Sequence, residues 1–177
     1  MTIEQYNKSI ETGELQLTSW DKFKYYFLPV LLFFASVVFL TGLFDGSKSN
    51  DKPSIAFIIV PAIVGSLFYM IQKSALKFQV VESNLSKNDL LLLMKNLSDE
   101  QKWSIVSQEG DVFIANSDFS AGRKTKKITV LFDGSKVFLN CIIDPDIEKS
   151  APDLLGNNRE TIKIIIDRLQ STQETSG

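Results

Sequence analysis

The sequence predicts an α+β membrane protein built in two parts. Residues 20–74 are expected to form a transmembrane helical hairpin, and residues 75–170 a small soluble domain of order β-α-β-β-β-β-α, with both helices on one face of an antiparallel sheet. Three observations predict this architecture. They are two long uncharged apolar runs, a series of segments in which apolar and polar residues alternate, and two segments with helical spacing of apolar residues.

The two apolar runs are residues 25–44 and 55–72, and neither contains a charged side chain. A helix of about twenty residues is about 30 Å long, which matches the hydrocarbon core of a bilayer. The connection, residues 45–54, is polar and short enough to join only antiparallel neighbours. We do not interpret the first run as a cleaved signal peptide, because it is longer than one and no small-residue cleavage pattern follows it.

The distribution of lysines predicts the orientation of the hairpin. Basic residues concentrate on the cytoplasmic side of a membrane, and both flanks of the hairpin carry more of them than the connection does. Both termini and the soluble domain are therefore expected in the cytoplasm. The single cysteine, Cys141, agrees, because it cannot form an internal disulfide. The lysines are Lys8, Lys22 and Lys24 before the hairpin, Lys48 and Lys52 in the connection, and Lys73, Lys77 and Lys87 after it.

Small residues within the two spans let helix backbones approach closely. They serve either packing within the hairpin or self-association of several copies. Neither span carries an acidic or basic side chain, so the usual parts of a proton relay or ion pathway are missing and a transporter is disfavoured. The small residues are Ala35 and Ser36 in the first span and Ala62, Gly65 and Ser66 in the second.

Both ends of the chain are expected to be loosely ordered. In residues 1–19, Gly13 interrupts any helical period, so we expect a flexible tail. An amphipathic helix lying on the membrane is the alternative, although its acidic residues would be repelled by anionic lipid. Residues 171–177 are polar and are expected to be a disordered tail.

The soluble domain shows clear element signals. A strand is predicted at 76–82, and the spacing of Ser86 and Asp89 is typical of a helix start. Two β-hairpins follow, with strands at 103–107 and 112–116 and at 128–132 and 136–143, the second around the turn signal Asp133-Gly134. The last helix begins near Asn157-Asn158 and presents Ile162, Ile165, Ile166 and Leu169 on one side.

The second hairpin divides its side chains between two faces of the sheet. One face is apolar and is expected to be the core; its residues are Ile128, Val130, Val137, Leu139, Cys141 and Ile143. The other face is only half polar, so we expect a partner copy, another protein or the membrane to cover part of it. Its residues are Thr129, Leu131, Phe138, Asn140 and Ile142.

A basic cluster lies between the two hairpins. It is either a solvated turn or a contact with anionic lipid headgroups, since the domain follows the membrane closely and each nearby cation contributes about 1 kcal/mol to such a contact. Its residues are Arg123, Lys124, Lys126 and Lys127.

Composition disfavours most chemistry. The chain has no histidine and one cysteine, which removes the commonest general base and makes a thiol nucleophile pair unexpected. We expect no cofactor, no metal and no small-molecule substrate, and we interpret the loop carboxylates Asp144, Asp146 and Asp153 as solvated turn formers. A formal net charge of −2 lacks the positive field that nucleic-acid binding needs.

Two resemblances accompany these patterns. The order strand, helix, four strands, helix is similar to the TATA-binding-protein-like fold, which hosts unrelated binding functions. The run from Trp103 through Asp144-Pro145 to Asn157-Asn158 resembles small two-helix membrane proteins of Bacteroidota. This second resemblance implies a bacterial inner-membrane location and carries no activity.

The sequence therefore favours a non-enzymatic inner-membrane protein whose cytoplasmic domain binds a protein partner or its own copies near the membrane surface. The alternative is an effector whose hairpins assemble and breach the bilayer. An enzyme is the least favoured class.

Overall fold

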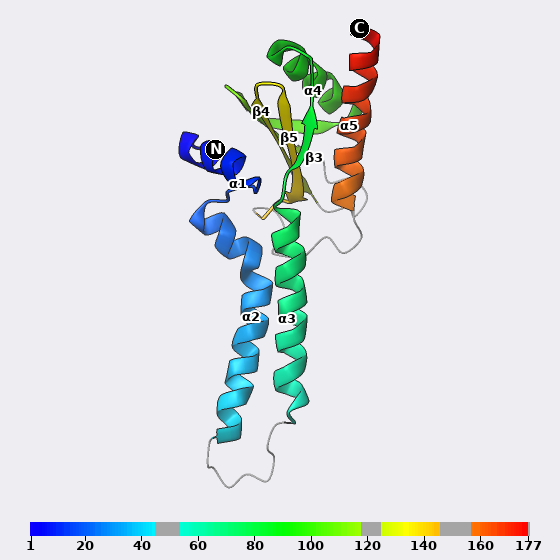
Figure 1. Cartoon of the computed structure of the whole chain (residues 1–177). Coiled ribbons are helices and arrows are strands. Elements are labelled where there is room, and N and C mark those ends of the chain that lie inside the picture. Colours follow the sequence, from blue (N-terminus) through cyan, green and yellow to red (C-terminus); the bar gives the residue numbers. More distant parts are fainter. Residues whose placement is uncertain (45–53, 118–124, 146–156, 177) are drawn as a thin grey trace.

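A computed structural model describes residues 1–44, 54–117, 125–145 and 157–176. Two long apolar helices pack together as an antiparallel pair, and an α+β unit stands at one end of that pair (Figure 1). The helices are α1 (Ile3–Thr12), α2 (Ser19–Phe44), α3 (Ala56–Ala75), α4 (Lys87–Gln101) and α5 (Asn157–Ser176). The strands are β1 (Gln79–Glu82), β2 (Trp103–Glu109), β3 (Val112–Ser117), β4 (Lys126–Asp133) and β5 (Lys136–Ile143).

Helices α2 and α3 are long and apolar enough to cross a membrane. Within the described chain, the qualifying segments are Ser19–Gly42 and Ala56–Ala75. Only 17% and 11% of their most apolar windows are buried inside the protein, so neither helix is the core helix of a soluble fold. Apolar side chains along both helices face outward instead, which is the arrangement that hydrocarbon, rather than water, would stabilise.

The described strands form one antiparallel sheet with the order β1-β5-β4-β3-β2. Both predicted β-hairpins are present, and Ile128 pairs with Cys141 in the second one. Gly110 and Gly134 each begin a two-residue turn with positive φ, at 57° and 60°, which glycine adopts without steric cost.

An irregularity in β2 changes which of its side chains face the core. Ile105 pairs with Ala115 while Ser107 pairs with Ile114, so Val106 is an extra residue between them. Before the irregularity, Trp103 packs against the main core, and after it Ser107 and Glu109 turn toward the opposite face. This bulge lies on a strand at the edge of the sheet.

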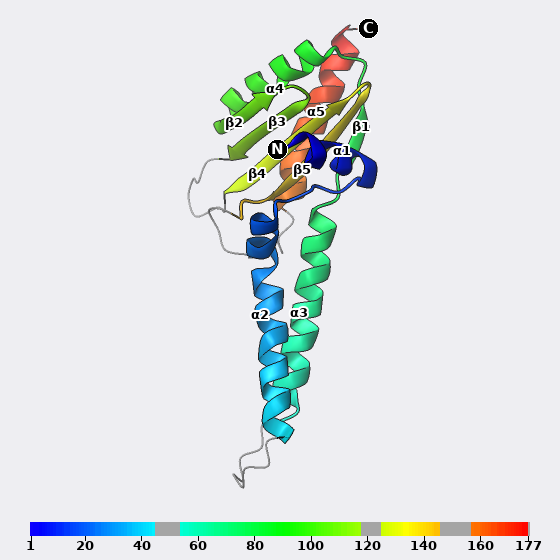
Figure 2. The ribbon, with the colours of Figure 1, turned by 90° about the vertical axis from the view of Figure 1, so that its left-hand side faces the viewer.

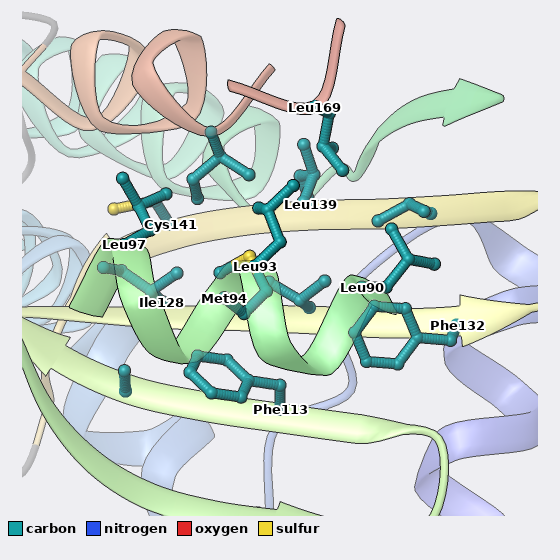
Figure 3. Close-up of a cluster of buried hydrophobic side chains, with 14 residues drawn as sticks. Leu90, Leu93, Met94, Leu97, Phe113, Ile128, Phe132, Leu139, Cys141 and Leu169 are labelled. Atoms are coloured by element: carbon teal, nitrogen blue, oxygen red, sulfur yellow. The ribbon is translucent and has the colours of Figure 1, made fainter. Parts of the chain in front are cut away.

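The core lies between the predicted apolar face of the sheet and helices α4 and α5. Figure 3 shows Leu93, Met94 and Leu97 of α4 directed toward Phe113 and Ile128 of the strands. The same cluster includes Ile165 and Leu169 of α5, so both helices cover one face, as expected. The buried members are Leu90, Leu93, Met94, Leu97, Phe113, Ala115, Ile128, Val130, Phe132, Val137, Leu139, Cys141, Ile165 and Leu169.

The N-terminal residues, which we expected to form a flexible tail, contain helix α1. Thr2 caps it by accepting a hydrogen bond from the Gln5 amide, and the Gln5 side chain accepts one from the Thr2 amide. Gly13 ends the helix in a left-handed conformation rather than preventing it. Figures 1 and 2 place α1 on the face of the sheet opposite to α5, so α1 packs against the sheet.

The C-terminal residues also differ from the expectation. Helix α5 continues to Ser176, beyond the start of the disordered tail expected from 171. The Gln173 side chain donates to the Glu82 carbonyl at the end of β1 (3.3 Å), and Arg168 pairs with Glu100 of α4. The Gln173 contact lies beyond Leu169, the last buried apolar residue of the helix.

Candidate functional site

The half-polar face of the sheet is buried within the chain itself. The most exposed of its five residues is Phe138, at 7%. The cover is neither a second copy nor another protein, but the N-terminal segment and the sheet-proximal ends of α2 and α3. The partner surface that we expected on this face is therefore occupied. The five residues are Thr129, Leu131, Phe138, Asn140 and Ile142.

A small apolar cluster joins the sheet to the two apolar helices. Ile142 of β5 is fully buried against Leu15 of the N-terminal segment, Tyr25 of α2 and Leu76 at the end of α3. Next to it, the rings of Phe78 and Phe138 meet edge to face, with centroids 5.9 Å apart. The sheet is thus packed onto the hairpin rather than tethered to it by a free linker.

Hydrogen bonds reinforce this junction. The Asn140 amide nitrogen donates to the Ala75 carbonyl (2.9 Å) and the Lys77 carbonyl (3.1 Å), which lie just where α3 ends. The backbone between α1 and α2 adds a short antiparallel bridge at Glu14 and Lys77. The carbonyls at a helix end lack intrahelical partners, so Asn140 satisfies groups that burial would otherwise penalise.

Helix α1 is held to the sheet by its only tyrosine. The Tyr6 hydroxyl donates to the Phe132 carbonyl on β4 at 2.6 Å. Burial, and then the carboxylates of Asp111 and Asp133, raise the pKa of this phenol above its usual 10.0. Only the neutral phenol can donate this hydrogen bond, so burial and the two carboxylates favour the protonation state that holds α1 on the sheet.

Two hollows flank α1 on the sheet. One, of about 110 Å³, lies beside Lys127, Thr129 and Asp21. The other, of about 440 Å³, is an open groove between the first turns of α1 and the β2–β3 turn at Glu109 and Asp111. The helix therefore covers the face without filling the space beneath it.

The basic cluster is divided between the two faces of the sheet. Arg123 and Lys124 lie outside the described residues. Lys126 points toward α5, where its ammonium donates to the Thr161 hydroxyl at 2.9 Å, whereas Lys127 lines the smaller hollow on the other face. Alternation along β4 separates these two lysines, so they do not form one basic patch.

The small residues of the hairpin divide in the same way. Gly65 and Ser36 are buried inside the pair of helices, and a Cβ placed on Gly65 would lie 3.2 Å from the Leu32 Cβ. Ser66 is exposed on the outside, and Ala35 and Ala62 are partly exposed. Packing within the hairpin thus uses Gly65 and Ser36.

Exposed apolar residues of the α+β unit are a feature that sequence reasoning missed. On the edge strand β2, Ile105 is 38% and Val106 is 59% exposed. The bulge is responsible, because it adds Val106 to the strand without a partner on β3. On the opposite edge, Val80 of β1 is 47% exposed.

The loop carboxylates are described only in part. Asp144 is 3% exposed and accepts a hydrogen bond from the Asn116 amide at 3.1 Å, so it is a buried structural group rather than a solvated turn former. Asp146 and Asp153 lie outside the described residues. Among the residues that the structure describes, no three His, Cys, Asp or Glu side chains gather to hold a metal ion.

A scan against protein-family models, and searches of curated proteins and of solved structures, find no match for this chain. The geometry of the described residues is therefore the basis for the function proposed below.

Proposed function

We propose that this chain is a non-enzymatic integral membrane protein whose α+β domain binds a protein partner or a second copy close to the membrane surface. The observation that carries the proposal is the exposed apolar edge of β2, at Ile105 and Val106. A sheet edge with unpaired backbone groups and apolar side chains favours pairing with a strand of another chain.

The membrane part of the proposal rests on α2 and α3. Both have the length and apolarity to cross a bilayer, and their side chains are exposed along that length. The lysine bias favours the cytoplasm for the α+β domain and both termini, and the resemblance to proteins of Bacteroidota favours a bacterial inner membrane.

The interaction part of the proposal rests on the edge of β2, which no other part of the described chain covers. The second face of the sheet is covered by the N-terminal segment and the ends of α2 and α3, whereas Val106 of β2 is 59% exposed. The junction at Asn140 holds the sheet against the helices, so the β2 edge keeps a constant relation to the bilayer. A partner strand would therefore meet this edge at a defined height above the membrane.

Symmetry favours another protein over a second copy on this edge. Antiparallel pairing of two β2 strands in one continuous sheet requires a two-fold axis perpendicular to the sheet. Figures 1 and 2 show the sheet standing upright above the hairpin, so this axis would lie in the membrane plane. Rotation about it would point the second hairpin away from the membrane that holds the first.

The test compares charge insertion at the two edges. Val106→Lys places an ammonium on β2, and Val80→Lys does the same on β1 at similar exposure. Full-length protein is crosslinked in native membranes and then purified in mild detergent. We expect a crosslinked species that Val106→Lys removes and Val80→Lys retains. If both variants, or neither, change the crosslinked species, the β2 edge is not the binding surface.

A further inference from the structure

One flank of the hairpin combines two lysines and two tyrosines at the end nearest the sheet. Lys22 precedes Tyr26 on α2 by one helical turn, and Lys73 follows Tyr69 on α3 by one turn. Because α2 runs away from the sheet and α3 returns toward it, each lysine lies on the sheet side of its tyrosine (Figure 1).

The contact between the two tyrosines shows that the Lys22–Tyr26 pair and the Lys73–Tyr69 pair lie on the same flank of the hairpin. The rings of Tyr26 and Tyr69 contact each other across the helix pair, with centroids 5.3 Å apart. Lys22 and Lys73 are both exposed one turn above this ring pair. Helix periodicity therefore places Lys22 and Lys73, from two different helices, on the same flank as the ring pair.

The level of these lysines matches the boundary of the apolar segments. Lys22 lies in the first turn of Ser19–Gly42 and Lys73 in the last turn of Ala56–Ala75. In a bilayer that covers these segments, both ammonium groups reach the headgroup layer, and the tyrosines lie at the boundary that aromatic rings favour. Phosphate is the anionic group present at that depth.

Neighbouring acidic groups leave the flank positive. Asp21 lines the hollow beside Lys127, on the sheet side of α2. Glu14, whose backbone bridges to Lys77, brings one negative charge near Tyr26, against the two positive charges of Lys22 and Lys73. Lys24, at the same level, belongs to another face of α2, where its ammonium lies 5.5 Å from the centre of the Trp20 ring.

We propose that Lys22 and Lys73, above the Tyr26–Tyr69 ring pair, form a binding site for the phosphate of one anionic phospholipid. The inference rests on the membrane part of the proposed function and not on the β2 edge. Two cations from opposite helices would bind one headgroup and so hold the ends of α2 and α3 together.

The test measures lipid preference of the full chain in nanodiscs of phosphatidylcholine with or without phosphatidylglycerol. Native mass spectrometry then counts the lipids that each variant retains. We expect retention of one phosphatidylglycerol, weakened about fivefold by Lys22→Gln and by Lys73→Gln, since RT ln 5 is about 1 kcal/mol, the contribution of one cation near the surface.

Matched variants separate a site from general surface charge. Lys24→Gln removes one charge at the same depth on a different face, and Lys95→Gln removes one on α4, away from the hairpin. Both should retain the lipid as the natural sequence does. Equal losses for Lys22→Gln and Lys24→Gln, or equal retention of both lipids by the natural sequence, would overturn the site.

Two further measurements distinguish lipid from free phosphate, and failure of the lipid site from failure of the proposed membrane function. If inorganic phosphate displaces the retained phosphatidylglycerol, the site binds free anion and the lipid proposal is wrong. If carbonate washing releases the protein from membranes, the proposed membrane function itself fails. Protein that resists carbonate but shows no preference for phosphatidylglycerol contradicts the lipid site alone.

Discussion

The Asn140 side chain on β5 donates a hydrogen bond to the Ala75 carbonyl at the end of α3, across 2.9 Å. This one contact joins an interior strand of the sheet to the last turn of the second apolar helix. Together with the Lys77 carbonyl, it makes the exit from the hairpin a structured corner. The position of the domain over the hairpin is therefore set by packing and hydrogen bonding.

Replacing Asn140 by leucine should loosen that corner. The change leaves the part-buried carbonyls of Ala75 and Lys77 without this donor, which costs about 1 kcal/mol. Hydrogen exchange at residues 76–78 should accelerate, and the thermal midpoint in detergent should fall. Asn88→Leu, on the exposed side of α4, is the control. Unchanged exchange in Asn140→Leu would show that the corner is held by other contacts.

Removing residues 2–12 should uncover the second face of the sheet. Ile114 and Thr129, which line the hollow beside α1, would become more accessible to water, because α1 no longer lies over that face. Exposed apolar surface promotes association. Light scattering of the detergent-solubilised protein should report larger particles than the natural sequence forms. A variant that stays at the original size and binds no apolar dye would show that α1 is dispensable as a cover.

The docking of α1 should weaken at high pH. The folded-state pKa of Tyr6 is raised above 10.0, so its contribution to stability is complete below about pH 10 and is lost as the pH rises through the folded-state value. The phenolate can no longer donate to the Phe132 carbonyl and is repelled by Asp111 and Asp133. Proteolytic cleavage within α1 should increase as the pH rises through the folded-state pKa of Tyr6.

Tyr6→Phe provides the control for that titration. It removes the hydroxyl that donates to Phe132 and leaves the ring, at a cost of about 0.5–1.5 kcal/mol. Cleavage within α1 should be faster than in the natural sequence at neutral pH and should not show the same rise with pH. An identical pH profile in both proteins would assign the transition to another group.

Enlarging Gly65 should separate the two apolar helices. A Cβ there would lie 3.2 Å from the Leu32 Cβ and 3.3 Å from the Pro29 carbonyl oxygen, so a leucine forces the backbones apart. Overpacking of this kind costs about 1–3 kcal/mol. Fluorescence transfer between labels on α2 and α3 should decrease for Gly65→Leu. Ser66→Leu, on the exposed side, should leave it unchanged.

Several features were accessible from residue patterns alone. Uncharged runs of about twenty residues predict α2 and α3, because helices of this length and apolarity can cross a bilayer. Alternation around Gly134 predicts both the β4–β5 hairpin and the face that carries Val130 and Leu139. The capping pair Thr2 and Gln5 marks the start of α1, and Gly13 is the cap at its C-terminal end rather than an interruption.

Only the tertiary structure decided what each surface contacts. A strand pattern shows that Phe138 and Ile142 lie on a half-apolar face, but not whether another molecule or the same chain covers it. The bulge that exposes Val106 arises from pairing between β2 and β3, and the ring pair of Tyr26 and Tyr69 from the approach of two helices. Local sequence determines helices and strands because their periodicity is set by neighbouring residues. The covered sheet face, the bulge in β2 and the tyrosine pair depend on contacts between residues far apart in the chain.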